Sequence, residues 1–394
     1  MEPIVMWGLR WLSHATGLGL VLWLLLLLPA RAADSLLMRI AIVQETSQVK
    51  LGSSVEGQIL DAEGNLLGTI DPMESRRASV EDGTITLSGT AADRLYLRAS
   101  SPDGLVYIAD RWYRGSVELR ADGSGLTAIN YVDLDDYIAS VVGAEMGDRF
   151  PLEALKAQAV AARTYALYHR NRRLGNPFDL GDTIAWQVYN GVETATANAQ
   201  QATQATSGQV VVHNSRLIDA VFHSSSGGYT ANSEDVWWDA RPYLRAVNDS
   251  HVSPAMPWQR QLEPDSLEEV FGEVGDVLDL EILEANEFGR AVSLRLHGTE
   301  SVQDLRANQF LLEMGLPSTV FTIEPVGPAN ASSAADGTDA EMPATLFTLT
   351  GQGFGHGIGM SQWGASGLAA QGWSYGQILE FYYQGTNLGA ISVQ

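Results

Sequence analysis

The sequence predicts an α+β protein, on three observations made along its 394 residues. Residues 34–130 alternate apolar with polar side chains in short runs between Gly/Asp turns, which is typical of half-buried strands. Residues 131–250 open with two successive helical patterns, and residues 251–326 change to an acidic composition with a strand and a helix of their own. We therefore expect a β-rich N-terminal part, a helical core with strands, and an inserted α/β subdomain.

Residues 1–33 are predicted to be a signal peptide. They contain Arg10, an apolar run from Gly17 to Leu28, and a small-residue cleavage site at residues 30–32. The run is short for a membrane span, which needs about 20 apolar residues, so an uncleaved anchor is the less favoured alternative. The sequence thus predicts export to the periplasm or cell wall, without tight membrane association once the segment is removed.

The composition limits the partners of the chain. It has no cysteine, and hence no disulfide framework. Its formal net charge is −23, which argues against nucleic acid as a partner, because phosphate binding requires basic surface. It argues equally against tight adhesion to an anionic polymer, so any glycan binding would depend on local contacts.

Residues 133–175 form the pattern around which the core is organised. Asp133 is suited to cap a first helix, whose apolar positions recur at helical spacing as far as residue 144. Gly147 interrupts the pattern, and an alanine-rich second helix is expected from Pro151 to a stop at Gly175. Glu145 stands at the break between the two helices.

Glu145 and Lys156 are the two residues here that suggest chemistry. At the end of a helix, after an apolar run, the Glu145 carboxyl would have a raised pKa suited to a general acid. Lys156 shares the second helix with Gln158 and Arg163. Taken alone, these residues are more simply interpreted as a surface carboxylate beside a turn and a lysine that extends into water.

Three long runs of sequence, found in a fixed order, favour the catalytic interpretation of this segment over the simpler one. They are YIASVVGAEM with EALKAQAVAARTYAL, then AVFHSSSGGYTANSEDVWWDARPYLRAV at residues 220–247, and GQGFGHGIGMSQWGASGLAAQGWSYGQILEFYYQGT at residues 351–386. Together they resemble the stage II sporulation protein D family (SpoIID/LytB domain). The resemblance runs from the end of the β-rich part almost to the end of the chain.

The resemblance implies a function on the bacterial cell wall. Characterised members are lytic transglycosylases that cut peptidoglycan glycan strands and leave 1,6-anhydro-N-acetylmuramic acid ends, with a glutamate at the position of Glu145 as the single acid/base. Tyr229 is a weaker catalytic candidate by position. Other members are described as enhancers of a partner amidase, so a non-catalytic glycan-binding role is the alternative. No cofactor is implied.

Some members of the family carry a zinc site after the long helix. Residues 176–192 here contain neither Cys nor His, so we predict no metal there. No HExxH motif occurs elsewhere in the chain.

We expect two groups of residues to bind the substrate. Side chains on the second helix would orient Glu145 or hold the glycan, and hydroxyl, imidazole and amide groups further along the chain would recognise sugar hydroxyls. A serine-type amidase is a third alternative, although the G-x-S-x-G elbow is absent. The expected substrate-binding residues are Lys156, Gln158, Arg163, His223, Ser224, Ser226, His356 and Gln362.

The remaining segments complete the predicted organisation. Residues 194–206 should be helical, and a strand pair is expected at 209–213 and 217–223 with a turn at residues 214 and 215. Residues 327–344 have the composition of a linker.

Residues 345–394 are predicted to form the second half of the core. Glycine occupies every second position from 351 to 359. On an extended strand these glycines would line one face, where either a ligand or the alanine-rich helix could approach closely. Two helices should follow, the first over 361–370 and the second with a capping box at Ser374 and Gln377.

Overall fold

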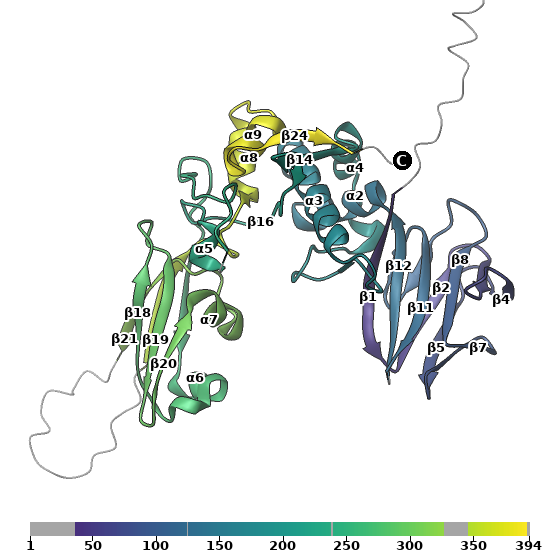
Figure 1. Ribbon diagram of the computed structural model, residues 1–394, viewed down its shortest axis with the longest axis horizontal. Coiled ribbons are helices and arrows are strands. Elements are labelled where there is room, and N and C mark those ends of the chain that lie inside the picture. The colour runs from purple at the N-terminus through teal and green to yellow at the C-terminus, as the bar shows by residue number, and fades with distance from the viewer. Residues whose placement is uncertain (1–35, 124, 238, 327–345, 392–394) are drawn as a thin grey trace, which may run out of the picture. The chain divides into compact units, whose positions relative to one another are not determined.

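The computed structural model describes residues 36–123, 125–237, 239–326 and 346–391 (Figure 1). The predicted signal peptide and linker therefore lie outside the described residues. Leu37–Ile391 form one compact unit that contains both helices and several sheets, which confirms the α+β class. Within the described ranges, no helix combines the length and the apolar character needed to cross a membrane.

The N-terminal part consists of two antiparallel sheets, extended at one edge by a short parallel strand. The larger has the order β13-β1-β12-β11-β8-β3-β4, and the smaller has the order β10-β9-β2-β5-β6-β7. Alternating apolar side chains such as Leu95, Leu97, Val117 and Leu119 are fully buried, as the two-residue period predicts. The strands are β1 Leu37–Thr46, β2 Gln48–Ser53, β3 Gly57–Leu60, β4 Leu66–Ile70, β5 Ser75–Glu81, β6 Thr84–Leu87, β7 Thr90–Ala92, β8 Arg94–Ala99, β9 Val106–Ile108, β10 Arg111–Tyr113, β11 Ser116–Asp122, β12 Gly125–Asp133 and β13 Leu180–Gly181.

Strand β12 leads directly into α2 (Leu134–Glu145). The Asp133 carboxylate accepts hydrogen bonds from two backbone N–H groups of the first turn, so the predicted cap is confirmed. Gly147, with φ +69°, lies in the break after α2. The next helix, α3 (Leu152–Arg172), begins after Pro151 and ends three residues before the predicted stop.

Helix α3 is the central element of the core. Its alanines are buried, and it contacts α2, α4 (Ala197–Ala205), α8 (Gln362–Ala370) and α9 (Tyr375–Tyr382). Small side chains permit this close approach on several sides. The short helix η1 (Gly191–Thr194) lies against Gly143, where an added Cβ would meet the Thr194 carbonyl oxygen at 1.7 Å.

The strands of the core are short. β14 (Gln209–His213) pairs with β15 (Arg216–Leu217) through a turn whose residues Asn214 and Ser215 have φ +50° and +60°, as predicted. The expected second strand is divided, because β16 (Phe222–His223) pairs instead with β23 (Met360–Ser361). β24 (Asn387–Ala390) returns from the C-terminal segment to β14.

The inserted part is built on two three-stranded sheets, β17-β22-β21 and β18-β19-β20. Strand β22 lies in the segment that we assigned to the second half of the core, but its hydrogen bonds join it to this sheet, and its Phe347 and Leu349 are buried in the core of the inserted part. The elements are β17 Pro257–Leu262, α6 Pro264–Phe271, η2 Gly272–Val274, β18 Val277–Ala285, β19 Ala291–Gly298, β20 Val302–Arg306, α7 Ala307–Met314, β21 Phe321–Val326 and β22 Leu346–Gln352.

The expected extended strand through the glycine run is wrong beyond β22. Gly353, Gly355, Gly357 and Gly359 all have positive φ, between +71° and +102°. They press against residues 221–227 and Arg290 rather than against α3. A Cβ on Gly359, for example, would lie 2.1 Å from the Val221 carbonyl oxygen. The glycines therefore permit a close approach of backbone to backbone.

Helices α8 and α9 follow as predicted. Ser361 caps α8 by accepting a hydrogen bond from the Gly364 N–H group. Ser374 and Gln377 form both hydrogen bonds of the capping box at the start of α9. Local sequence signals thus specify both helix starts.

Candidate active site

Glu145 is the last residue of α2 and is partly buried. Its Oε1 atom accepts a hydrogen bond from the backbone N–H of Val188 at 3.0 Å, and its Oε2 atom accepts one from Nε2 of Gln362 at 3.2 Å. Val188 belongs to the loop after β13, and Gln362 is the first residue of α8. Two segments far from α2 in sequence therefore fix both oxygens of the carboxyl group.

The electrostatic setting of Glu145 favours its protonated form. Burial raises the pKa of the carboxyl above its ordinary value, while the hydrogen bonds from Val188 and Gln362 oppose that rise. The carbonyl ends of α2 also disfavour a negative charge at this position. Among the described residues, no Lys or Arg forms an ion pair with this carboxyl.

A cavity of about 390 Å³ opens at Glu145. Much of its wall is aromatic or aliphatic, and Glu145 is the only Asp or Glu among its described lining residues. Ile184 and Phe354 are 90% and 57% exposed, so the rim presents apolar surface to solvent. Such a mixture of apolar surface with a few polar groups is typical of a ligand site. Polar and aromatic members of the wall include Tyr165, Trp186, Phe222, His223, Ser224, Trp237, Asn308, Phe354, His356 and Gln362.

Two neutral histidines stand in this wall, with ring centroids 5.5 Å apart. The partners of His356 fix its tautomer, because Nε2 donates to the Phe222 carbonyl at 3.0 Å and Nδ1 accepts from the Ile358 N–H at 3.0 Å. Burial lowers its pKa to about 4.

His223 differs in having one unused nitrogen. Its Nδ1 donates to the Ile358 carbonyl, whereas its buried Nε2 has no hydrogen-bond partner. Burial lowers the pKa of His223 well below its ordinary value. Nε2 is therefore a neutral acceptor that a ligand hydroxyl could satisfy.

Of the ten predicted site residues, five line the cavity, namely Glu145, His223, Ser224, His356 and Gln362. The other five lie elsewhere, and all of them except Gln158 have hydrogen-bond or ion-pair partners of their own. Arg163 is fully buried and donates to Asp135 at 2.8 Å and to the Thr206 carbonyl at 2.9 Å. Its charge is thus used to join α3 to α2 and to the end of α4.

Lys156 and Gln158, which both lie on α3, are also outside the cavity. Lys156 pairs with Glu153 at 2.6 Å and lies 5.9 Å from the ring centroid of Tyr375. Glu153 in turn accepts a hydrogen bond from the Tyr375 N–H at the start of α9. Gln158 is fully buried, and neither polar atom of its side chain has a partner.

Ser226 and Tyr229 complete the set outside the cavity. The Ser226 hydroxyl donates to the buried carboxylate of Asp249. Tyr229 stacks on Phe288 with centroids 4.5 Å apart, and its hydroxyl accepts from Asn248 at 2.8 Å. Both residues are engaged in contacts that stabilise the fold.

The serine-type alternative lacks a base. Within the described residues, no hydrogen bond joins a serine hydroxyl to an imidazole. Ser225 donates to the Pro254 carbonyl, and Ser361 contacts Ser253 and the Ser224 carbonyl. A nucleophilic serine needs an adjacent general base, so this arrangement does not provide one.

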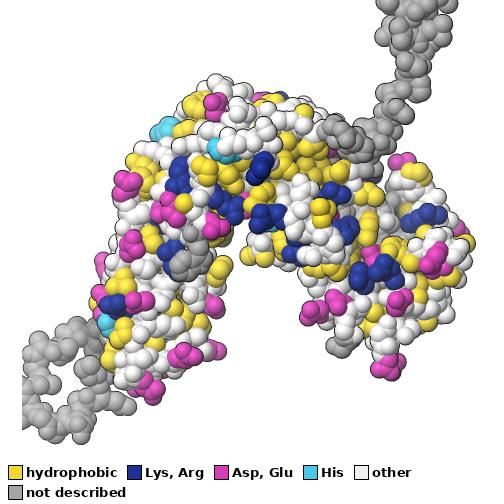
Figure 2. All heavy atoms as spheres, in the orientation of Figure 1, with side chains coloured by type: hydrophobic (Ala, Val, Ile, Leu, Met, Phe, Trp, Pro, Cys, Tyr) yellow, Lys and Arg dark blue, Asp and Glu magenta, His cyan; other side chains and the backbone are white. Residues whose placement is uncertain are grey.

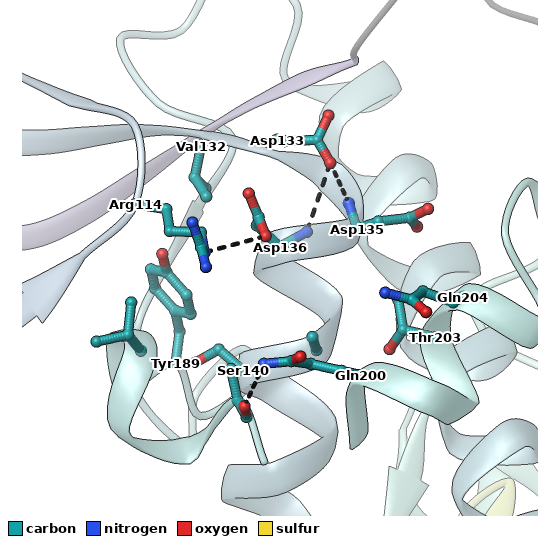
Figure 3. Close-up of a pocket in the computed structure, with 14 residues that line it drawn as sticks. Arg114, Val132, Asp133, Asp135, Asp136, Ser140, Tyr189, Gln200, Thr203 and Gln204 are labelled. Atoms are coloured by element: carbon teal, nitrogen blue, oxygen red, sulfur yellow. Dashed lines mark hydrogen bonds and ion pairs between the residues drawn. The ribbon is translucent and has the colours of Figure 1, made fainter. Parts of the chain in front are cut away.

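A second pocket, of about 230 Å³, lies beside the start of α2 (Figure 3). It contains three carboxylates with assigned roles. Asp133 caps α2, Asp135 pairs with Arg163, and Asp136 faces Arg114 at 3.4 Å. In the part of the chain that the structure describes, no group of three or more His, Asp or Glu could hold a metal ion.

Sequence reasoning missed several residues that line the cavity, among them Val188, Trp237, Asn308 and Leu312. The Val188 donor is a backbone N–H group, for which the sequence carries no signal. Trp237 lies within the second of the three runs that carry the family resemblance, but its residue type alone does not show that it lines the cavity. Asn308 and Leu312 come from α7 of the inserted part, which we had treated as separate from the site.

Comparisons with known proteins bear on the identity of the chain. The model of the stage II sporulation protein family matches residues 122–213, and a domain of unknown function matches residues 258–359. Stage II sporulation protein D of Bacillus subtilis is 28% identical over 66% of this chain and 76% of its own length. That of Bacillus amyloliquefaciens is 30% identical over 66% of this chain and 75% of its own.

A further relative is the amidase enhancer of Bacillus subtilis. It is 31% identical over 64% of this chain, although the match spans only 40% of the enhancer. The matched family region contains α2 and Glu145, and the long matches to the sporulation proteins confirm the resemblance seen in the sequence. The chain therefore belongs to the stage II sporulation protein D family.

Proposed function

We propose that this protein is an exported lytic transglycosylase that cleaves peptidoglycan glycan strands, with Glu145 as its single general acid/base. The observation that carries the proposal is the cavity in which a partly buried glutamate with a raised pKa is the only carboxylate among the described lining residues. Family membership supports an action on the cell wall. Export would follow from the signal peptide predicted at residues 1–33.

The number of carboxylates favours this chemistry over hydrolysis. Glycosidases that use water generally place two carboxyl groups about 5–9.5 Å apart across the bond that breaks. A transglycosylase needs only one, because the sugar's own C6 hydroxyl replaces water as the nucleophile.

In the proposed reaction Glu145 acts twice. The protonated carboxyl gives its proton to the glycosidic oxygen, the bond from C1 to that oxygen breaks, and the leaving sugar departs with a hydroxyl group. The resulting carboxylate then takes the proton of the C6 hydroxyl as its oxygen bonds to C1, which closes the 1,6-anhydro ring. The proton is thus restored to Glu145, and no water or other reactant is consumed.

The neighbours of Glu145 suit both halves of this cycle. Burial favours the protonated carboxyl that the first step needs, and the donors Val188 and Gln362 stabilise the carboxylate that follows. Nε2 of His223 can accept a hydrogen bond from a sugar hydroxyl or N-acetyl group, since it is an acceptor without a partner. The lowered pKa values of His223 and His356 also mean that neither imidazole favours a positive charge beside the carboxyl.

Product analysis of the full chain incubated with purified peptidoglycan and with peptide-free glycan strands tests the proposal. Mass spectrometry should detect anhydro-ended fragments, and Glu145→Gln should reduce their yield about 10²–10⁴-fold, the usual contribution of general acid/base catalysis. The matched control is Glu193→Gln, which removes an exposed carboxylate outside the cavity. Reducing ends in place of anhydro ends would overturn the transglycosylase mechanism.

A non-catalytic role is the second candidate, motivated by the relative named amidase enhancer. In that case the cavity would hold a glycan strand while a cell-wall amidase acts on it. The folded Glu145→Gln variant separates the two proposals, because it should still stimulate an added amidase if the function is binding alone. Stimulation without any anhydro product from the unaltered chain would favour the enhancer.

A further inference from the structure

The cavity at Glu145 does not end at Trp237. A further cavity, of about 600 Å³ and distinct from the pocket of Figure 3, adjoins it. Both cavities are lined by Trp237, Asn308 and Leu312. Trp237 follows the short helix α5 (Ser233–Val236), while the other two residues stand on α7 of the inserted part. The two cavities therefore adjoin at these three residues, with Trp237 at the junction. We call the further cavity the far section.

Helix α7 supplies the far section with one face. Its buried residues Ala307, Phe310 and Leu311 point into the core of the inserted part. Gln309, Leu312 and Glu313 are exposed, and their spacing of three and four residues places them on one side of the helix. Leu312 is 70% exposed, which is unusual for a leucine unless something else covers it.

The charges of the far section disfavour an anionic ligand. Arg241 pairs with Asp219 at 2.7 Å, and Arg306 donates to the carbonyls of Glu234 and Asp235 at 2.9 and 3.1 Å. Figure 2 shows Lys and Arg side chains near α5 with Asp and Glu side chains beside them. These two cations are thus already engaged by the protein.

The acidic residues of the far section have no such partners. Asp239 and Glu313 are exposed and line the cavity, and neither takes part in an ion pair among the described residues. They would repel carboxylates such as those of a peptide, but they can accept hydrogen bonds from hydroxyl groups. An aromatic ring and an exposed leucine, flanked by carboxylates and amides, match the apolar face and the polar edge of a sugar.

We propose that the cavity beyond Trp237 is a subsite for a further N-acetylglucosamine unit of the strand bound at Glu145. The inference rests on the proposed function, which it deepens by giving the inserted part a role in binding the substrate. Trp237 stacks against a sugar ring at the junction of the two cavities. Gln309 and Glu313 contact the sugar beyond it.

The test measures binding rather than cleavage. Full chains carrying Glu145→Gln are titrated by calorimetry with short and long oligomers of β-1,4-linked N-acetylglucosamine. The long oligomer should bind more tightly than the short one. Adding Trp237→Ala should weaken the long oligomer about tenfold, as expected for loss of an aromatic stacking partner, and Trp237→Phe should recover much of that loss.

The far section alone is tested by the double variant Gln309→Ala/Glu313→Ala. It should weaken the long oligomer several-fold and leave the short one unchanged, because neither residue lines the cavity at Glu145. The control is Gln261→Ala/Glu284→Ala, which removes the same side-chain types from exposed strand positions outside both cavities. Circular dichroism checks that all variants fold.

Three results would overturn the subsite. The first is that Gln309→Ala/Glu313→Ala weakens the short and the long oligomer equally. The others are that the chain with Glu145→Gln alone binds both oligomers equally well, or that it binds a peptide-bearing fragment more tightly in a way that depends on the far section. Failure of the lyase itself is separable, since it would appear as missing anhydro products while the dependence of binding on length persists.

Discussion

Carboxylates of α2 line both the pocket of Figure 3 and the cavity at Glu145, but the groups that compensate their charge differ. Asp135 pairs with Arg163, and Asp136 is partly compensated by Arg114, although burial still raises its pKa. Glu145 is compensated only by two neutral hydrogen-bond donors. Loss of a proton at Asp136 restores an ion pair, whereas loss of a proton at Glu145 leaves an isolated charge. That difference suits Glu145 to give up a proton and to take one back.

The largest effect is expected from removing Arg163, the ion-pair partner of Asp135. Arg163→Met would leave the Asp135 carboxylate and several carbonyls without their donor, and loss of one partner of a buried pair typically costs about 3–5 kcal/mol. The partial exposure of Asp135 favours the lower end of that range. Denaturant unfolding measures the loss.

The control for Arg163 is Arg295→Met. Arg295 bonds Asp304 at 2.7 Å, but both side chains are exposed, so the loss should be much smaller than for Arg163→Met. If Arg163→Met instead keeps its stability and loses glycan cleavage, Arg163 belongs to the substrate site after all.

The next effect concerns Glu145, the carboxylate that has no ion-pair partner among the described residues. Gln362→Leu removes a donor to the Glu145 carboxylate, and a hydrogen bond to a charged group contributes about 1.5–3 kcal/mol, with the lower end expected at 3.2 Å. The variant should raise the pKa of Glu145 further. Because the acid must be protonated in the first step, the alkaline fall of the pH–rate profile should move to higher pH.

The pH profile of cleavage checks this directly, with Gln261→Leu as the control on an exposed strand. An unchanged alkaline limb in Gln362→Leu would show that Gln362 does not interact with the carboxylate during the reaction.

A smaller effect concerns stability and pH. A carboxyl whose pKa is raised in the folded state stabilises the fold at pH below its unfolded pKa, and this contribution is lost as pH rises through the folded pKa. Glu145→Gln has no such titration. The melting temperature of the variant relative to the parent should therefore be higher at pH 8 than at pH 4. A difference that does not change with pH would contradict the raised pKa.

The smallest effect is expected at Lys156. Its charge pairs with Glu153, and it lies outside the cavity, so Lys156→Met should change stability by less than about 1 kcal/mol. Cleavage of glycan strands should fall by less than about twofold, as for a partly exposed pair with no contact to the site. A large loss of activity with unchanged stability would return Lys156 to the glycan site, as the sequence had suggested.

Local signals in the sequence predicted the frame of the molecule. The Asp133 cap, the turn at Asn214 and Ser215, and the capping box at Ser374 each depend on a few neighbouring residues. They could be predicted because their hydrogen bonds are made within one turn of the chain. The position of Glu145 at the end of a helix followed from the same kind of signal.

The contacts that complete the site could not be predicted in this way. Arg163 and Gln362 both lie on helices, but only the tertiary packing decides that one faces Asp135 and the other Glu145. The prediction of an extended strand through the glycine run was wrong for a related reason. Glycine at every second position suggests a strand unless the positive φ angles are known. The strand partner of β22 is equally a long-range choice.

The hydrogen bond from Gln362 to Glu145 joins residues 217 positions apart. A ribosome that has just added Glu145 needs on the order of ten to forty seconds, at about 5–20 residues per second, to reach Gln362. During that time α2 can form, but the wall contributed by residues 354–362 does not yet exist. A growing chain therefore lacks a complete cavity at Glu145 until α8 has been made and docked.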